Sequence, residues 1–243
     1  MNFGERSEIK LFQKIIQFLE SERIGRFATI DKNGFPFIAP MNFVFFNSCF
    51  YVHGFPKGEK FENIKTNAKC GFEVDKELAF LPSYFFEPPT DASKTDTLYI
   101  SIVVKGTAEL VIDNEEKSAT LNALMEKSQL EGGYERLRPE MATVKGVGLI
   151  KIKPEVMTGK YKLGRFWDEK EKIEIATRMM KRAVEMPKRT VELLNIAGLL
   201  LMGEDYIKEL AWLHTTQLVR MMGFVNREKY PEISLYKAEE TDW

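Results

Sequence analysis

The chain has 243 residues, of which 44% are hydrophobic and 29% are charged, and its formal net charge is −1. These values are ordinary for one large globular domain, or for a domain of about 150 residues with an appendage. The small net charge gives no overall reason to expect a nucleic-acid partner. Two cysteines are too few for a disulfide framework, and two histidines without suitably spaced carboxylates argue against a metal site.

The beginning of the chain shows no charged segment followed by an apolar one, so we expect a cytoplasmic rather than a secreted protein. The longest apolar run, Leu193–Met202, contains Asn195 and is too short to span a bilayer. We therefore expect no membrane partner.

Hydrophobic periodicity predicts the first elements. Apolar residues at helical spacing predict an amphipathic helix over residues 8–22, after which the period changes to that of strands. Asn33-Gly34 is typical of a hairpin turn, and Pro36 and Pro40 place the returning strand at an edge or a bulge. The predicted strands are residues 26–30, 35–46, 49–53, 69–74, 98–112 and 146–152.

Two helices are expected between these strands, over residues 59–67 and 115–128, and Asp113 with Glu116 forms a capping box before the second. Residues 76–97 hold three prolines around an aromatic cluster and are expected to form a long loop, which inside a compact domain is usually functional. Six strands joined mostly by hairpins predict a mainly β fold with helices (α+β), built on an antiparallel barrel.

The remainder of the chain has a helical pattern. Helices are expected over residues 168–186, from Pro187 onward, and over residues 204–222, where Gly223 ends the last one. The predicted domains are therefore a barrel domain of residues 1–165 and a helical C-terminal extension of residues 166–243.

A short segment has the composition of a phosphate site. Lys57, Gly58 and Lys60 stand where the helix of residues 59–67 begins, and a phosphate is held by backbone N–H groups at a helix start together with Lys or Arg. A solvated turn with lysines is the alternative. His53 ends the preceding strand and could donate to a phosphate or a ring, or be an ordinary half-buried strand residue, whereas His214 is expected in a helix core.

Pro40-Met41-Asn42 is the second unusual segment. A proline in a strand removes a ladder donor and leaves neighbouring backbone groups free for a ligand. Asn42 offers both a donor and an acceptor to a pyrimidine edge. An ordinary edge strand remains the alternative. The sequence contains no G-x-G-x-x-G, G-x-x-x-x-G-K-[ST], H-E-x-x-H or G-x-S-x-G motif, so Rossmann, P-loop, zincin and hydrolase interpretations lose support.

These residues resemble the flavin-binding split-barrel superfamily of pyridoxamine 5′-phosphate oxidase, and within it the nitroimidazole-resistance-like branch. The resemblance rests on four blocks with their spacing intact: IGRFATIDKNGFPFIAPMNFVF, FYVHGFPKGEKFENIKTNAKCGFEVD, YISIVVKGTAELVIDNEEKSATLNALM and KIKPEVMTGKYKLGR. It covers roughly residues 8–165, and the helical tail beyond is longer than this branch leads us to expect.

The resemblance implies a homodimer of six-stranded split barrels that binds FMN at the subunit interface. Residues implied to run alongside the isoalloxazine are Pro40, Met41, Asn42 and Phe43. Residues implied to surround the phosphate are His53, Lys57, Gly58 and Lys60. Tyr99 and Ser101 would lie close to the ring, and Lys160 and Lys162 match the Gly-Lys-x-Lys end of related members.

The leading functional prediction is an FMN-dependent oxidoreductase that passes electrons to a small electron-poor substrate such as a nitroaromatic, with NAD(P)H as a possible donor. His53 and Tyr99 are the candidates for a general acid. The alternatives are a flavin- or haem-binding sensor without turnover, and a pyridoxamine 5′-phosphate oxidase proper. A basic stretch could serve a nucleic-acid-binding regulator, but glutamates dilute it and a solvated helix face is favoured; it comprises Arg178, Lys181, Arg182, Lys188 and Arg189.

Overall fold

The structure is a computed structural model that describes residues 12–164, 167–185 and 190–202. The chain divides into two compact units. The barrel unit comprises residues 8–76 and 100–161, and the helical unit comprises residues 77–99 together with residues from 162 onward. This division differs from the predicted boundary at residue 165, because the far ends of three long strands belong to the helical unit.

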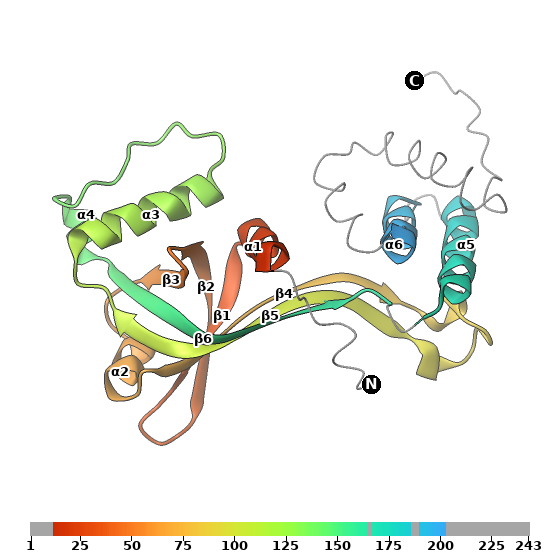
Figure 1. The fold of residues 1–243 in the computed structure, drawn as a ribbon, viewed down its shortest axis with the longest axis horizontal. Helices are drawn as coiled ribbons and strands as arrows, with labels where there is room; N and C mark the ends of the chain where they lie inside the picture. Colours follow the sequence, from red (N-terminus) through yellow and green to blue (C-terminus); the bar gives the residue numbers. More distant parts are fainter. Residues whose placement is uncertain (1–11, 165–166, 186–189, 203–243) are drawn as a thin grey trace. The chain divides into compact units, whose positions relative to one another are not determined.

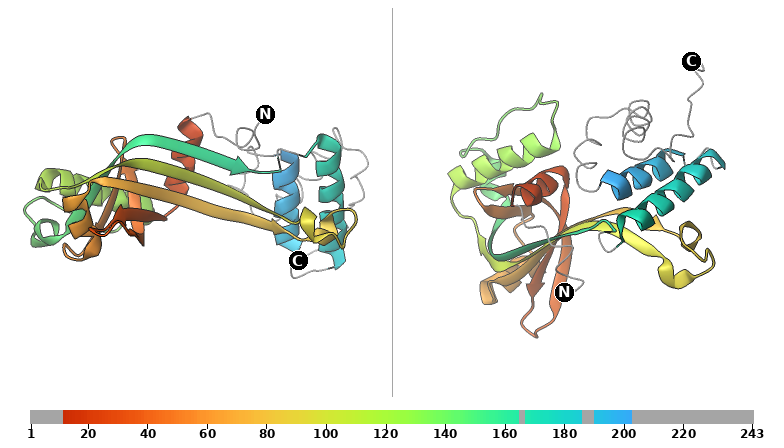
Figure 2. Two further views of the ribbon diagram at one scale, coloured as in Figure 1. Left: turned by 90° about the horizontal axis from the view of Figure 1, so that it is seen from below. Right: turned by 45° about the vertical axis from the view of Figure 1, so that its right-hand side comes forward.

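Six strands form an antiparallel barrel, as the sequence predicts. They are β1 (Ile24–Ile30), β2 (Pro36–Phe46), β3 (Cys49–Gly54), β4 (Lys69–Leu81), β5 (Asp96–Leu110) and β6 (Gly148–Lys162). The barrel closes in the order β1-β2-β3-β6-β5-β4. Figure 2 shows the long strands β4, β5 and β6 running side by side.

The predicted hairpin between β1 and β2 is confirmed. The Asp31 carboxylate accepts hydrogen bonds from the N–H groups of Asn33 and Phe35, each at 2.8 Å, and Gly34 has a positive φ of 88°. Residues 36–42 of β2 pair with β1, whereas the ladder to β3 begins only at Phe43. Among the residues that the structure describes, the half of β2 that contains Pro40 has a strand partner on one edge only, which confirms the edge position predicted from the two prolines.

Aromatic side chains fill the barrel. Phe27, Phe43, Phe50 and Phe72 are all at most 1% exposed. The ring centroid of Phe72 lies 5.0 Å from that of Phe50 and 5.3 Å from that of Phe43, within the range of favourable aromatic contacts. Gly25 is required in β1 because a Cβ there would lie 2.3 Å from the Phe72 ring.

Four helices belong to the barrel unit: α1 (Phe12–Ser21), α2 (Glu59–Thr66), α3 (Asn114–Ser128) and α4 (Ala142–Gly146). Figure 1 shows α1 and α3 on one side of the barrel and α2 on the other. Asp113 caps α3 by accepting from the N–H groups of Glu115 and Glu116. The reciprocal half of the predicted capping box is replaced, because the Glu116 carboxylate accepts instead from the Tyr51 hydroxyl at 2.7 Å and from Lys151 at 2.8 Å.

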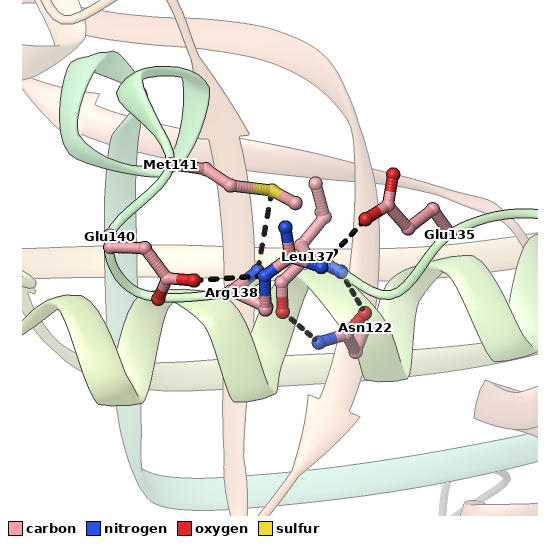
Figure 3. Close-up of polar contacts among 6 residues, drawn as sticks. All are labelled: Asn122, Glu135, Leu137, Arg138, Glu140 and Met141. Atoms are coloured by element: carbon pink, nitrogen blue, oxygen red, sulfur yellow. Dashed lines mark hydrogen bonds and ion pairs between the residues drawn. The ribbon is translucent and has the colours of Figure 1, made fainter.

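The segment after α3, which contains Gly132 and Gly133, is a loop. Figure 3 shows how it is fastened: the buried Asn122 amide donates to the Leu137 carbonyl at 2.8 Å and accepts from the Leu137 N–H at 2.9 Å. Arg138 is held between Glu135 and Glu140. One buried side chain of α3 therefore fixes the course of this loop.

The helical unit is built on the strand ends. It contains the short 3₁₀ turns η2 (Ser83–Phe85) and η3 (Ala92–Lys94) and the helices α5 (Glu169–Glu185) and α6 (Thr190–Met202). Figure 2 shows α5 and α6 side by side, and both contribute to one hydrophobic cluster with the ends of β4 and β5. The predicted loop over residues 76–97 is correspondingly shorter, because β4 continues to Leu81 and buries Ala79 and Leu81 in this cluster, and β5 begins at Asp96.

Two further predictions concern the last helix and membrane-spanning helices. The predicted helix over residues 204–222, with His214, lies outside the described residues. Within the described ones, no helix combines the length and apolar character needed to cross a membrane.

Candidate functional site

The start of α2 is fixed against the barrel by two contacts. Gly54 at the end of β3 pairs with Gly148 at the start of β6. Phe61 of α2, 1% exposed, packs on Gly148 so closely that a Cβ there would lie 2.5 Å from its ring. Two residues after Phe61, the Asn63 amide donates to the Thr29 hydroxyl at 3.0 Å, and both side chains are buried. The helix therefore begins beside the end of β3.

This arrangement brings three segments of the sequence together. A Cβ added at Gly54 would lie 3.6 Å from Lys60 Nζ and 3.9 Å from Met41 Cε. Lys60 from α2, Met41 from β2 and the bare backbone of Gly54 from β3 thus meet at one place. We call this place the Lys60 corner.

The first turn of α2 suits an anion in part. Gly58 is the N-cap, with φ of 115°, and no side chain caps the helix. Lys57 and Gly58 are exposed, so both are open to a ligand. The first turn also carries Glu59 and Glu62, of which Glu62 forms an ion pair with Lys65 at 2.8 Å.

The open edge of β2 reaches the Lys60 corner. The β2–β3 ladder ends at the pair Phe43–Val52, so within the described part of the chain residues 36–42 keep one edge without a strand partner. Pro40 and Asn42 are exposed on this half-strand and Met41 is half-buried. In an antiparallel pair alternate residues turn their N–H and C=O groups away from the partner, and such groups can bond a flat ligand.

Phe43 differs from its predicted role. Its side chain is fully buried in the aromatic core, and its N–H donates to the Arg23 carbonyl. Its carbonyl accepts from Lys127 Nζ at 3.1 Å, and the same ammonium lies 3.6 Å from the Phe43 ring centroid. Both the ring and the backbone of Phe43 are therefore engaged within the chain, and we assign it to the core.

His53 is half-buried, and burial lowers the pKa of its imidazole. Its Nδ1 is buried and has no hydrogen-bond partner within the described part of the chain. Successive side chains of a strand point to opposite faces, so His53 lies on the face of Tyr51, opposite to that of Gly54. The structure therefore does not bring the imidazole to the same face as Lys60.

The remaining predicted residues lie on β5 and β6. Tyr99 and Lys162 belong to the helical unit, where Lys162 Nζ lies 5.7 Å from the Tyr99 ring centroid and forms an ion pair with Asp96. Ser101 and Lys160 belong to the barrel unit and are half-buried. The predicted set is thus divided between the two units.

Sequence reasoning missed Gly54, Gly148 and Asp96. The glycines matter through the β3–β6 register, which joins residues 94 positions apart and has no local signal. Asp96 precedes a predicted strand, and nothing in its neighbourhood indicates Lys162 as a partner. No cluster of three or more potential metal ligands occurs among the described residues.

Comparison with protein families found a match to the pyridoxamine 5′-phosphate oxidase model over residues 13–161. The chain belongs to this family. It is a family of flavin-binding proteins, which confirms the resemblance drawn from the four sequence blocks. A comparison with curated proteins found no match.

Solved structures show the same fold. A protein from Bacteroides thetaiotaomicron assigned to 5-nitroimidazole antibiotic resistance is 24% identical, with a TM-score of 0.52 over 63% of this chain and 85% of that one. The flavocytochrome Anf3 from Azotobacter vinelandii is 19% identical, with a TM-score of 0.58 over 70% and 77%. The FAD and haem binding protein from Mycobacterium smegmatis is 15% identical, with a TM-score of 0.55 over 70% and 79%.

Proposed function

We propose that this member of the family binds FMN at the Lys60 corner and is an oxidoreductase for a small electron-poor substrate of the nitroaromatic kind. The observation that carries the proposal is the meeting of Lys60, Gly54 and the open edge of β2. A phosphate requires a cation and close backbone approach, and a flat ring requires free backbone groups beside it. The Lys60 corner offers all three.

The bound flavin supplies the redox chemistry, and the chain supplies binding and orientation. Lys60 holds the phosphate, Gly54 leaves room for it, and the backbone of residues 40–42 bonds the edge of the ring. Met41 contributes an adaptable apolar surface to the ring. Because His53 faces the other side of β3, we propose no general acid among these residues.

The first experiment identifies the cofactor and then removes one contact. The purified protein is expected to release FMN on denaturation, detected by absorbance and mass spectrometry. Lys60→Ala is expected to weaken FMN binding by about 1.5–3 kcal/mol, which is the usual value for a hydrogen bond to a charged group. Fluorescence titration of the released protein with FMN measures this.

Lys65→Ala is the matched control, because Lys65 lies on the same helix, is exposed and pairs only with Glu62 among the described ion pairs. It is expected to leave FMN affinity unchanged. Equal affinities of the Lys60 and Lys65 variants would remove the phosphate assignment, and release of FAD or haem in place of FMN would contradict the cofactor proposed.

Turnover is tested separately from binding. Bleaching of the flavin by NAD(P)H, followed by reoxidation with a nitroaromatic, would support the enzyme. A protein that binds FMN but is not reduced by either nicotinamide would favour a sensor. We also propose a homodimer, as the family resemblance implies, and light scattering of the loaded protein measures its mass.

A further inference from the structure

The helical unit contains a cavity of about 450 Å³, which is within the size range of small-molecule sites. Its walls come from the segment of residues 86–96 and from α5 with the residue Trp167 that precedes it. All of them belong to the helical unit, and none of them takes part in the Lys60 corner. The cavity is therefore a candidate for a second site.

One wall is aromatic and held in place. The Trp167 ring lies 5.5 Å from the Phe86 ring, measured between centroids, and Ile175 of α5 is buried beside them. A Cβ at Gly164 would lie 2.3 Å from the indole, and Gly164 adopts a φ of 66° that glycine tolerates best. The backbone N–H of Trp167 donates to the Gly164 carbonyl at 3.1 Å. These contacts fix the position of the indole.

The lining carries more acidic than basic residues. Its carboxylates are Glu87, Asp96, Glu171 and Glu174, and its cations are Lys94 and Arg178.

Both cations already contact other groups of the helical unit. Arg178 donates to the Phe85 carbonyl at 2.9 Å and lies 3.4 Å from Glu87 and 3.7 Å from Glu174. Lys94 donates to the carbonyl of Glu87. An anionic ligand would have to compete with these contacts, so the cavity does not suit an anion.

Asp96 provides an acceptor. Its side chain is 12% exposed; Oδ1 accepts from Lys162 Nζ and from the N–H of Thr97. Oδ2 is buried and has no hydrogen-bond partner among the residues that the structure describes. A buried carboxylate oxygen without a donor is costly, and a ligand that brings an N–H group would relieve that cost. A metal ion is a poor alternative, since no group of three potential ligands is found in the described ranges.

We propose that this cavity binds a small organic cation, an ammonium or amidinium group carried on a flat aromatic body. The body lies against Trp167 and Phe86, where a cation is also attracted by the faces of the rings. The Asp96 carboxylate, which lines the cavity, rotates on binding so that Oδ2 accepts from the N–H group of the ligand. This site is independent of the flavin site, so each proposal can fail without the other.

Phenethylammonium is the probe, and phenylacetate, which has the same ring and the opposite charge, is its matched comparison. Calorimetry on the full chain is expected to show one saturable site for phenethylammonium and at least about tenfold weaker binding of phenylacetate. Asp96→Asn is expected to weaken phenethylammonium binding by about tenfold or more, as for a lost charged hydrogen bond. Trp167→Leu should weaken it similarly, whereas Trp167→Phe should retain most of the affinity.

Glu77→Gln is the control, since Glu77 is an exposed acid of the same unit that does not line the cavity. It is expected to bind as the unmodified chain does. Circular dichroism of each variant verifies folding, and if Asp96→Asn does not fold, the pair Trp167→Leu and Trp167→Phe decides. Absence of binding, equal binding of phenylacetate, or equal losses in the Asp96 and Glu77 variants would overturn the proposal.

Discussion

The barrel unit and the helical unit bury their side chains in different ways. In the barrel unit, aromatic rings from several strands interlock, as in the contacts of Phe72 with Phe43 and Phe50. In the helical unit, two helices lie on strand ends and short 3₁₀ turns, and a cavity remains beside Trp167. The difference indicates that a closed barrel leaves the proposed FMN site at a strand edge, whereas helices packed on strand ends leave room for the proposed second site.

The largest expected effect tests the barrel core. Phe50→Ala should lower the free energy of unfolding by about 3–5 kcal/mol, because it removes a fully buried ring from close-packed neighbours. Urea denaturation measures the loss. Ile112→Ala, at a side chain 86% exposed, should change the free energy by no more than about 0.5 kcal/mol. Similar losses in both variants would mean that the aromatic cluster is not the core.

The corresponding change in the helical unit tests whether the two units unfold independently. Met179→Ala removes a fully buried side chain of α5 and should cost about 2–5 kcal/mol in the stability of that unit. Hydrogen exchange should speed up in α5 and α6, while FMN affinity stays unchanged. If exchange accelerated equally in β1 and β2, the units would unfold as one, and the comparison would not hold.

A smaller effect is expected where α2 meets β6. Gly148→Ala forces the Phe61 ring, 2.5 Å from the added Cβ, to shift, at a cost of about 1–3 kcal/mol. FMN binding should weaken too, because the same contact positions Lys60. Gly146→Ala is the control two residues away, since its added Cβ would meet nothing within 4 Å. A weakened FMN affinity in the Gly146 variant would contradict this explanation.

The smallest effect concerns pH. Burial lowers the pKa of Lys127 to about 8 from its ordinary value of 10.5. Between these values the unfolded chain holds the proton and the folded chain does not, so Lys127 makes stability rise with pH in this window. The free-energy difference between the unmodified chain and Lys127→Met should change by about 1 kcal/mol between roughly pH 7.5 and 9.5.

Tyr51 acts in the opposite direction and at higher pH. Burial and its hydrogen bond to Glu116 raise its pKa to about 12, so its contribution is lost only as the pH rises above roughly 10. Tyr51 and Cys70, whose pKa burial also raises to about 12, are present in both proteins, so their titration cancels in the free-energy difference that reports on Lys127. A pH-independent difference between the two proteins would show that Lys127 keeps its charge in the folded chain, held by the carbonyls of Leu19 and Phe43.

The basic stretch illustrates how tertiary contacts change an expectation. Arg178 lines the cavity, and Arg182 lies 4.3 Å from the Tyr84 ring centroid. Neither is part of a free basic face, whereas Lys188 and Arg189 lie outside the described residues. Charge composition alone could not reveal this, because the partners come from residues 84–87, more than 90 positions away in the chain.

The sequence by itself determined the elements that depend on neighbouring residues. Alternation of apolar residues, the Asn33-Gly34 turn and the Asp113 cap gave the strands, the first hairpin and the start of α3, since these obey local rules of period and capping. It also determined the family, through four sequence blocks that keep the spacing of the family. Tertiary structure alone decided the rest: that β4 and β6 extend, that Phe43 belongs to the core, that His53 faces away from Lys60, and that Asp96 forms an ion pair with Lys162. Each of these depends on register and on long-range burial, which join residues that the chain itself keeps far apart.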